Sequence, residues 1–209
     1  MTTQQQYLLV VDDIPDILKL LHATLQFKGY RVVTARNGHE ALEEIQRERP
    51  ALIIADILMP RMDGFSLVHR LRLNPETRDI PVVFLSATYV APEDKEFALT
   101  IGVTRFIEKP VDLEEFLPMI GELLAKGAPA SLEPINEFDF YEGYRKRLET
   151  KLKQKNIQIA RDEHLLVTLS EAEKPSIEAA LSQAVSEREE IQHLLNQIRD
   201  QVENLKKQE

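Results

Sequence analysis

The chain has 209 residues, a formal net charge of −9 and no cysteine. This charge argues against a surface that binds nucleic acid or anionic membrane along the whole chain, and the lack of cysteine excludes disulfides, thiolate metal sites and cysteine nucleophiles. No apolar run reaches the roughly 18 residues of a membrane span, and residues 1–6 do not resemble a signal peptide, so we expect a cytoplasmic protein.

Glycine and proline are unevenly distributed along the chain. Residues 1–127 hold six of the seven glycines and eight of the eleven prolines. Both residue types mark chain reversals, so the first part of the chain turns often and the second part rarely. We expect one domain over 1–127, a linker over 128–136 and a helical region over 137–209.

The first part alternates short apolar runs of strand length with stretches of helical period. This alternation predicts an α/β fold with a five-stranded, doubly wound parallel sheet and helices on both faces. We expect Gly29 to end the first helix, and Asp112 with Glu115 to cap the last one. The predicted strands are Tyr7–Val11, Arg31–Ala35, Leu52–Ala55, Val82–Leu85 and Thr104–Ile107, and the predicted helices are Ile14–Lys28, His39–Arg49, Phe65–Arg72, Glu93–Thr100 and Leu113–Leu124.

Polar side chains follow four of the predicted strands. Alone, each could be a helix cap or a surface residue, but the carboxyl ends of parallel strands share one edge of a sheet, where ligands bind. Three carboxylates at one edge repel each other unless a cation is present, and oxygen ligands suit Mg²⁺. A carboxylate there can become an acyl phosphate, stabilised by a metal and a lysine. The residues are Asp12, Asp13, Asp56, Ser86 and Lys109.

Residues 7–124 resemble the receiver domain of two-component response regulators. The resemblance implies a flavodoxin-like receiver fold and a phospho-acceptor signalling protein rather than an enzyme, with only self-phosphotransfer and autodephosphorylation. It implies that Asp56 takes a phosphoryl group from a sensor histidine kinase or a phosphotransfer protein. The matching stretches are VVDD at Val10–Asp13, DILMPRMDG at Asp56–Gly64, LSA at Leu85–Ala87 and EKP at Glu108–Pro110.

The same resemblance implies roles for individual residues. Ser86 and Lys109 would contact the phosphoryl group, and the Lys109–Pro110 bond would be cis. Ser86 stands where threonine is common, and Phe106 where tyrosine is common. Movement of Ser86 toward the phosphate would free space for the Phe106 ring and change the surface around it. The implied Mg²⁺ ligands are Asp12, Asp13, Asp56 and the backbone carbonyl of Leu58.

The second part of the chain predicts two long helices joined by a break at 170–176. We expect an antiparallel helical hairpin, or coiled coil, that forms a homodimer through residues 137–209 and binds a downstream protein partner. A monomeric hairpin and a partly disordered tail are the alternatives. The 4-3 seam of the first helix holds Leu148, Leu152, Lys155, Ile159, Asp162, Leu166 and Leu169, with Phe138, Tyr141 and Tyr144 upstream, and that of the second holds Ile177, Leu181, Ala184, Arg188, Ile191, Leu195, Ile198, Val202 and Leu205.

Two other outputs are possible for the helical part. The segment 145–155 has six basic residues and one acidic residue, which would suit a DNA-binding transcriptional regulator. A DNA-reading helix-turn-helix needs short helices and a tight turn, which this pattern lacks. A phosphorelay intermediate would need a phosphorylatable histidine, and His164 and His193 lack the proline-ended box of kinases. We therefore expect protein interaction, without membrane or nucleic-acid binding.

Overall fold

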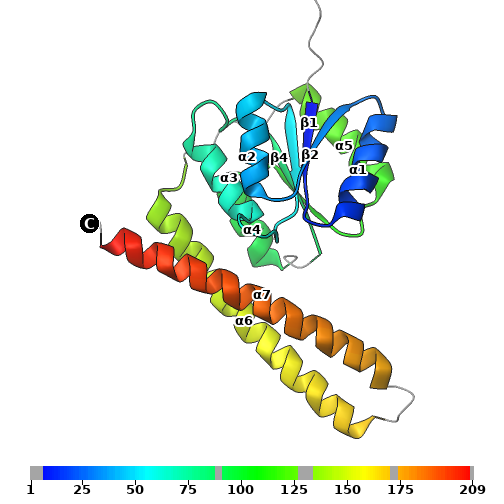
Figure 1. Cartoon of the computed structure of the whole chain (residues 1–209), viewed down its shortest axis with the longest axis vertical. Helices are drawn as coiled ribbons and strands as arrows, with labels where there is room; N and C mark the ends of the chain where they lie inside the picture. Colours follow the sequence, from blue (N-terminus) through cyan, green and yellow to red (C-terminus); the bar gives the residue numbers. More distant parts are fainter. Residues whose placement is uncertain (1–6, 88–90, 127–133, 170–173, 208–209) are drawn as a thin grey trace, which may run out of the picture. The chain divides into compact units, whose positions relative to one another are not determined.

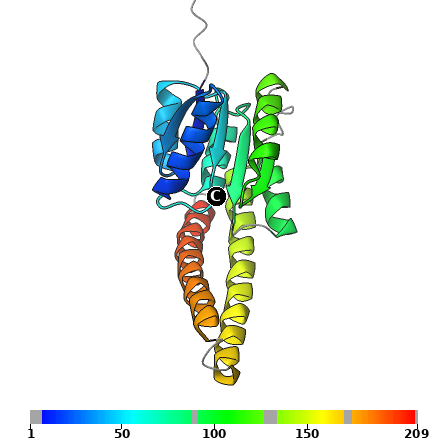
Figure 2. The ribbon, with the colours of Figure 1, turned by 90° about the vertical axis from the view of Figure 1, so that its right-hand side faces the viewer.

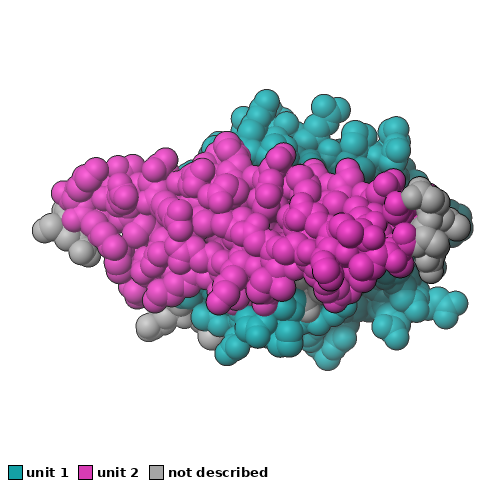
Figure 3. All heavy atoms as spheres, turned by 90° about the horizontal axis from the view of Figure 1, so that it is seen from below, with its two compact units in different colours: residues 1–135 teal, residues 136–209 magenta. Residues whose placement is uncertain are grey.

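A computed structural model describes residues 7–87, 91–126, 134–169 and 174–207 (Figure 1). The chain divides into two compact units, residues 1–135 and 136–209, which Figure 3 colours separately. The predicted linker 128–136 lies largely outside the described residues, so its bounds remain a prediction. Within the described ranges, no helix is long and apolar enough to cross a membrane.

The first unit is built on a parallel sheet with the strand order β2-β1-β3-β4-β5. This arrangement confirms the predicted fold class. β1, β3 and β4 are buried along their whole length, as expected for strands covered on both faces. The strands are β1 (Tyr7–Val11), β2 (Arg31–Ala35), β3 (Leu52–Ala55), β4 (Val82–Ser86) and β5 (Arg105–Glu108).

Five helices cover the sheet, with α1 and α5 on one face and α2, α3 and α4 on the other (Figure 1). Under α1 and α5, a core cluster joins Leu21 and Ile120 to strand residues such as Val10. On the other face, the ring of Phe65 in α3 meets Phe84 edge-on at 5.4 Å between centroids. The helices are α1 (Pro15–Phe27), α2 (Gly38–Arg47), α3 (Gly64–Leu73), α4 (Pro92–Thr100) and α5 (Leu113–Lys126).

The observed elements lie within two residues of the predicted bounds. α2 ends at Arg47 rather than at Arg49, because Glu48 already has extended backbone angles ahead of Pro50. Gly29 has a φ of +88° and donates its N–H to Gln26 O at 2.9 Å, which confirms it as the residue that ends α1. Asp112 Oδ1 accepts from the Glu114 N–H at 2.8 Å and caps α5.

Gly64 permits a close approach between α3 and the end of β3. A Cβ atom on this residue would lie 2.5 Å from the backbone oxygen of Asp56 and 3.0 Å from Ile57 Cα. We expect Gly64→Ala to lower the free energy of unfolding by about 1–3 kcal/mol in urea titrations. Gly121→Ala is the matched control, because its nearest neighbour would be Tyr30 Oη at 3.8 Å. Equal effects of the two substitutions would contradict the steric explanation.

The second unit is a hairpin of two long antiparallel helices, α6 (Glu137–Thr168) and α7 (Lys174–Lys206) (Figure 2). The pairs Glu149–Arg199 at 2.8 Å and Lys155–Glu187 at 2.7 Å run in opposite chain directions. The predicted hairpin is therefore confirmed. The part of the predicted break at 170–173 lies outside the described residues, and Lys174 begins α7 with Pro175 in its first turn.

The burial pattern of the hairpin follows the predicted seam with one correction. All nine seam positions of α7 are buried or half-buried, and in α6 Leu148, Ile159 and Asp162 are buried. The predicted stripe omitted Phe140, which is fully buried, and included Phe138, which is only half-buried. The 4-3 spacing selects the wrong residue in the first turns of α6. Phe140 lies one helical turn before Tyr144 and therefore shares its buried side, because an α-helix has 3.6 residues per turn.

Candidate functional site

The strand order brings Asp12 and Asp56 together. β1 and β3 are neighbours in register, with Val11 opposite Ala55, so the residue after each strand lies at the same edge of the sheet. The backbone ladder continues past the strands, because the Asp56 N–H donates to Val11 O at 2.8 Å. The site is therefore positioned by the sheet rather than by a free loop.

Lys109 links these two carboxylates. Its Nζ donates to Asp12 Oδ2 and to Asp56 Oδ1, both at 2.8 Å, and its side chain is only 18% exposed. The Lys109 N–H donates to the backbone oxygen of Ser86 at 3.0 Å, and the Lys109–Pro110 peptide bond is cis. Lys109 follows β5 and thus reaches the ends of β1 and β3 through its ammonium and the end of β4 through its backbone N–H.

Asp56 is a carboxylate whose side chain is 13% exposed and whose pKa is strongly shifted. Burial raises its pKa from 3.8 to about 6, although the charge and hydrogen bond of Lys109 act in the opposite direction. Its Oδ2 accepts from the Leu58 N–H at 2.9 Å. At neutral pH the Asp56 carboxylate is still mostly ionised, and its two oxygens accept hydrogen bonds from Lys109 and from the Leu58 N–H. This combination is typical of a carboxylate that does chemistry.

Asp12 and Asp13 lie differently although they are adjacent in the chain. Asp12 is buried, and its Oδ1 accepts from the Ile14 N–H at 2.9 Å. Asp13 is exposed, and its pKa is raised by partial desolvation and then by the neighbouring Asp12 charge. Both observations place negative charge at this edge beyond what Lys109 neutralises.

The chemistry of these donors fits Mg²⁺. In the described part of the chain, no three side chains of His, Cys, Asp or Glu are arranged as a ready metal cage. Mg²⁺ does not need such a cage, because it commonly takes one or two carboxylates and completes its shell with water and phosphate oxygens. Asp12 and Asp56 offer carboxylate oxygens of the kind that Mg²⁺ prefers, and one oxygen of each already binds the Lys109 ammonium.

Ser86 and Phe106 lie on the neighbouring strands β4 and β5. Ser86 is buried, whereas Phe106 is half-buried and stands opposite Phe84 in the strand register. The Nζ of Lys95 in α4 lies 5.9 Å from the centre of the Phe106 ring and also pairs with Glu108. Sequence reasoning missed this Lys95 contact, because a single lysine in a helix follows no recognisable pattern.

The basic segment 145–155 is partly neutralised within the hairpin. Arg145 pairs with Glu142 at 2.7 Å and with Glu149 at 2.9 Å, and Lys155 pairs with Glu187 at 2.7 Å. Pairing with carboxylates removes charge that phosphate recognition would need. His164 and His193 are both exposed on the hairpin.

Comparison with known proteins gives consistent matches over the first unit. The model of the response regulator receiver domain family matches residues 8–121. An uncharacterized 14.6 kDa protein of Leptolyngbya boryana is 40% identical over 57% of this chain and 90% of its own length. Transcriptional regulatory protein GlrR of Escherichia coli K12 is 39% identical over 64% of this chain, which covers only 29% of GlrR.

Solved structures give the same result for the fold. Chemotaxis response regulator CheY4 of Vibrio cholerae shares 34% sequence identity and a TM-score of 0.53, over 57% of this chain and 99% of that chain. A CheY-like receiver domain protein of Methanospirillum hungatei is 31% identical with a TM-score of 0.54, over 59% of this chain and 96% of that one. The hairpin lies outside the residues that the family model matches.

Proposed function

The chain belongs to the response regulator receiver domain family of two-component signalling, and on this premise we propose that Asp56 accepts a phosphoryl group from a histidine kinase or a phosphotransfer protein. The observation that carries the proposal is the Lys109 ammonium held 2.8 Å from both Asp12 and Asp56. The same ammonium would also balance part of the charge on a phosphoryl group bound to Asp56. We place the protein in the cytoplasm, where such phosphodonors act.

The chemical step follows from the geometry of Asp56. A carboxylate oxygen attacks the phosphorus atom, the bond between phosphorus and the donor atom breaks, and the donor leaves with that electron pair. The product is an acyl phosphate on Asp56. Lys109 balances charge on the phosphoryl oxygens, and the Leu58 N–H holds the carboxylate in place.

We assign the Mg²⁺ site to Asp12, Asp13, Asp56 and the backbone carbonyl of Leu58. A bound Mg²⁺ would neutralise charge on the phosphoryl oxygens. The raised pKa values of Asp13 and Asp56 support this assignment, because desolvation first and the charge of Asp12 second disfavour their ionised forms, which a bound cation would stabilise. The protein acts as a phospho-acceptor, so its own chemistry is limited to taking up and losing this group.

The signal leaves the site through Ser86 and Phe106. After phosphorylation, the Ser86 hydroxyl and Lys109 turn toward the new oxygens, and the Phe106 ring takes the space that Ser86 leaves. The half-buried position of Phe106 supports this role, since the proposed movement needs a ring that is neither fully buried nor fully exposed. A changed surface at β5 would then be recognised by the helical output or by a downstream protein.

The hairpin is proposed as a protein-interaction and dimerisation output. The DNA-binding alternative depended on the basic segment 145–155, and the ion pairs of Arg145 and Lys155 weaken it. The phosphorelay alternative depended on His164 or His193, which are both exposed on the hairpin, and His193 Nε2 lies at hydrogen-bond distance, 3.1 Å, from the Gln197 amide nitrogen.

A phosphorylation assay with a small phosphodonor tests the proposed function. We expect the full chain to gain the mass of one phosphoryl group from acetyl phosphate in the presence of Mg²⁺, measured by intact mass spectrometry. Chelation of the metal is expected to slow the gain by at least about tenfold. A chain that stays unmodified with Mg²⁺, or gains the group equally fast without it, would contradict the proposal.

A further inference from the structure

A shallow groove runs along one flank of the hairpin. It has a volume of about 480 Å³ and is lined by the apolar residues Leu152, Ile157, Ala160 and Leu195, with the Glu149–Arg199 ion pair at 2.8 Å also in its lining. Ile157 is 62% exposed, so its apolar side chain is open to solvent along this groove. Ile157 does not belong to the seam between α6 and α7, so the hairpin itself does not use it.

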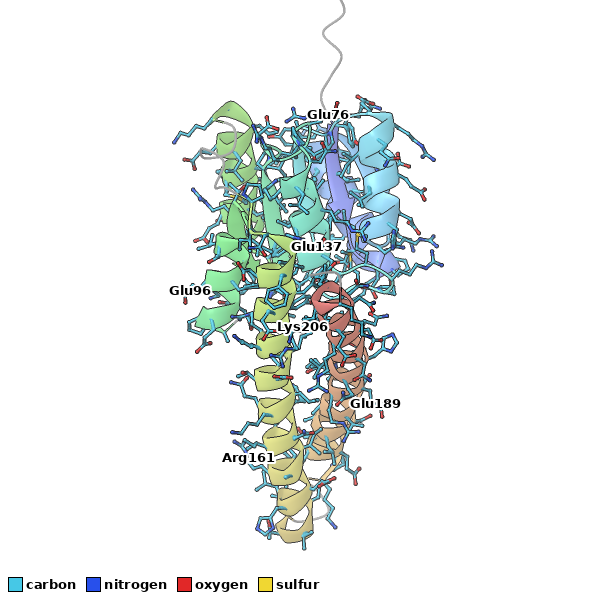
Figure 4. The ribbon with its side chains drawn as sticks, turned by 90° about the vertical axis from the view of Figure 1, so that its left-hand side faces the viewer. Glu76, Glu96, Glu137, Arg161, Glu189 and Lys206 are labelled. Atoms are coloured by element: carbon cyan, nitrogen blue, oxygen red, sulfur yellow. The ribbon has the colours of Figure 1, made fainter. Side chains whose placement is uncertain are left out.

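Exposed side chains of opposite charge lie on the two helices of the hairpin, although α6 also exposes Glu163 and α7 also exposes Arg199. On α6, Lys146, Lys153 and Arg161 are exposed, and on α7, Glu189 and Glu203 are exposed. Figure 4 shows Arg161 and Glu189 on the outer sides of their helices. Lys153 also lines the groove. The basic edge of α6 (Lys146, Lys153, Arg161) therefore runs beside an exposed apolar groove. The residues of the acidic edge of α7 (Glu189, Glu203) do not line this groove.

We propose that this groove binds the hairpin of a second copy of the chain, with the basic edge of α6 against the acidic edge of α7 from that copy. A twofold axis makes the same contact twice, because each copy offers both edges. A single hairpin has one apolar seam, and a second hairpin over Ile157 completes a four-helix bundle. The inference rests on the output role proposed above and names its partner; it does not require phosphorylation.

Sedimentation of the full, unphosphorylated chain over a concentration series tests the proposal. We expect a dimer with a dissociation constant in the micromolar range or below. Ile157→Glu is expected to weaken the dimer at least about tenfold, because it places a carboxylate in the apolar groove. Phe27→Glu is the matched control, since Phe27 is 87% exposed on α1 in the other unit, and it is expected to leave the dimer unchanged.

A charge exchange tests the pairing of the two edges. Lys153→Glu and Glu189→Lys are each expected to weaken the dimer, and the double variant is expected to recover most of the loss. Both residues are exposed, so circular dichroism is expected to show intact helices in every variant. A wild-type monomer at all concentrations, a dimer that Ile157→Glu leaves intact, or a double variant weaker than both single variants would each overturn the proposal.

The same samples separate this inference from the proposed function. Phosphoryl uptake from acetyl phosphate is measured on each variant beside its sedimentation, and Ile157→Glu is expected to take up the group at the wild-type rate. Loss of the dimer with normal uptake supports the groove as the interface. A wild-type chain that dimerises but takes up no phosphoryl group would contradict only the phospho-acceptor role.

Discussion

Asp56→Asn is expected to abolish phosphoryl uptake and, at the same time, to stabilise the unphosphorylated protein. The asparagine amide is not a nucleophile, so we expect uptake from acetyl phosphate to fall at least about 100-fold. The stabilisation arises from the same burial that makes Asp56 reactive. Burial raises the pKa of Asp56 from 3.8 to about 6, so the ionised carboxylate is less favourable in the folded chain than in the unfolded chain.

The direction of the pH dependence follows from this pKa. Between pH 3.8 and about 6, the folded chain keeps a proton on Asp56 that the unfolded chain has lost. The stability from Asp56 is therefore full below pH 3.8 and is lost as the pH rises through about 6. At pH 7 the ionised Asp56 carboxylate lowers the free energy of unfolding by roughly 1–3 kcal/mol. The asparagine amide removes this cost, and Lys109 then has one carboxylate partner fewer.

Urea unfolding and phosphoryl uptake measured on the same variant check both halves of this expectation. Asp16→Asn is the matched control, because Asp16 is an exposed aspartate in α1. That variant is expected to keep wild-type uptake and nearly wild-type stability. Uptake by Asp56→Asn at the wild-type rate would show that another residue is the acceptor.

Lys109→Met is expected to have the second-largest effect, with losses in both stability and reactivity. The lysine is the shared partner of the buried Asp12 and of Asp56, whose side chain is 13% exposed. Removing one member of a buried charge cluster costs about 3–5 kcal/mol, because the remaining charges are left without compensation. We expect a fall of this size in the free energy of unfolding at pH 7.

The pH dependence of Lys109→Met identifies the cause of its instability. Burial raises the pKa of Asp56, and Lys109 lowers it, so without Lys109 this pKa rises above about 6. The variant is expected to gain more stability than the wild type when the pH falls from neutral to acidic, and to take up the phosphoryl group better at alkaline pH. Lys126→Met in α5 removes an exposed lysine and serves as the control. A variant with wild-type stability at neutral pH would contradict the role of Lys109 as a charge clamp.

Sequence patterns predicted the sheet well because every strand carries a short apolar run between turn residues. The site followed from one rule of topology, since Asp12 and Asp56 come after strands whose carboxyl ends share an edge. The contact between Lys95 and Phe106 could not be predicted in this way, because it depends on how α4 lies against β5. The exposure of Asp13 beside the buried Asp12 has the same origin in three-dimensional packing.

The sequence pattern predicted the buried seam of α7 more accurately than that of α6. The seam of α7 was predicted position by position, because an uninterrupted 4-3 spacing leaves one consistent register. In α6 the spacing shifts near Leu148, and there the prediction omitted Phe140. The apolar groove beside Ile157 has no signature in the chain, because it forms from side chains of two helices that are about 40 residues apart.

Locating the phosphoryl group on the wild-type chain tests the central claim most directly. After exposure to acetyl phosphate and Mg²⁺, borohydride reduces an acyl phosphate to the alcohol, and tandem mass spectrometry of the digested chain identifies the residue that was reduced. We predict a single reduced residue at Asp56, with Asp12 and Asp13 unchanged. Reduction at Asp12 or Asp13, a phosphate ester on Ser86, or a phosphoramidate on a histidine of the hairpin would each contradict the account.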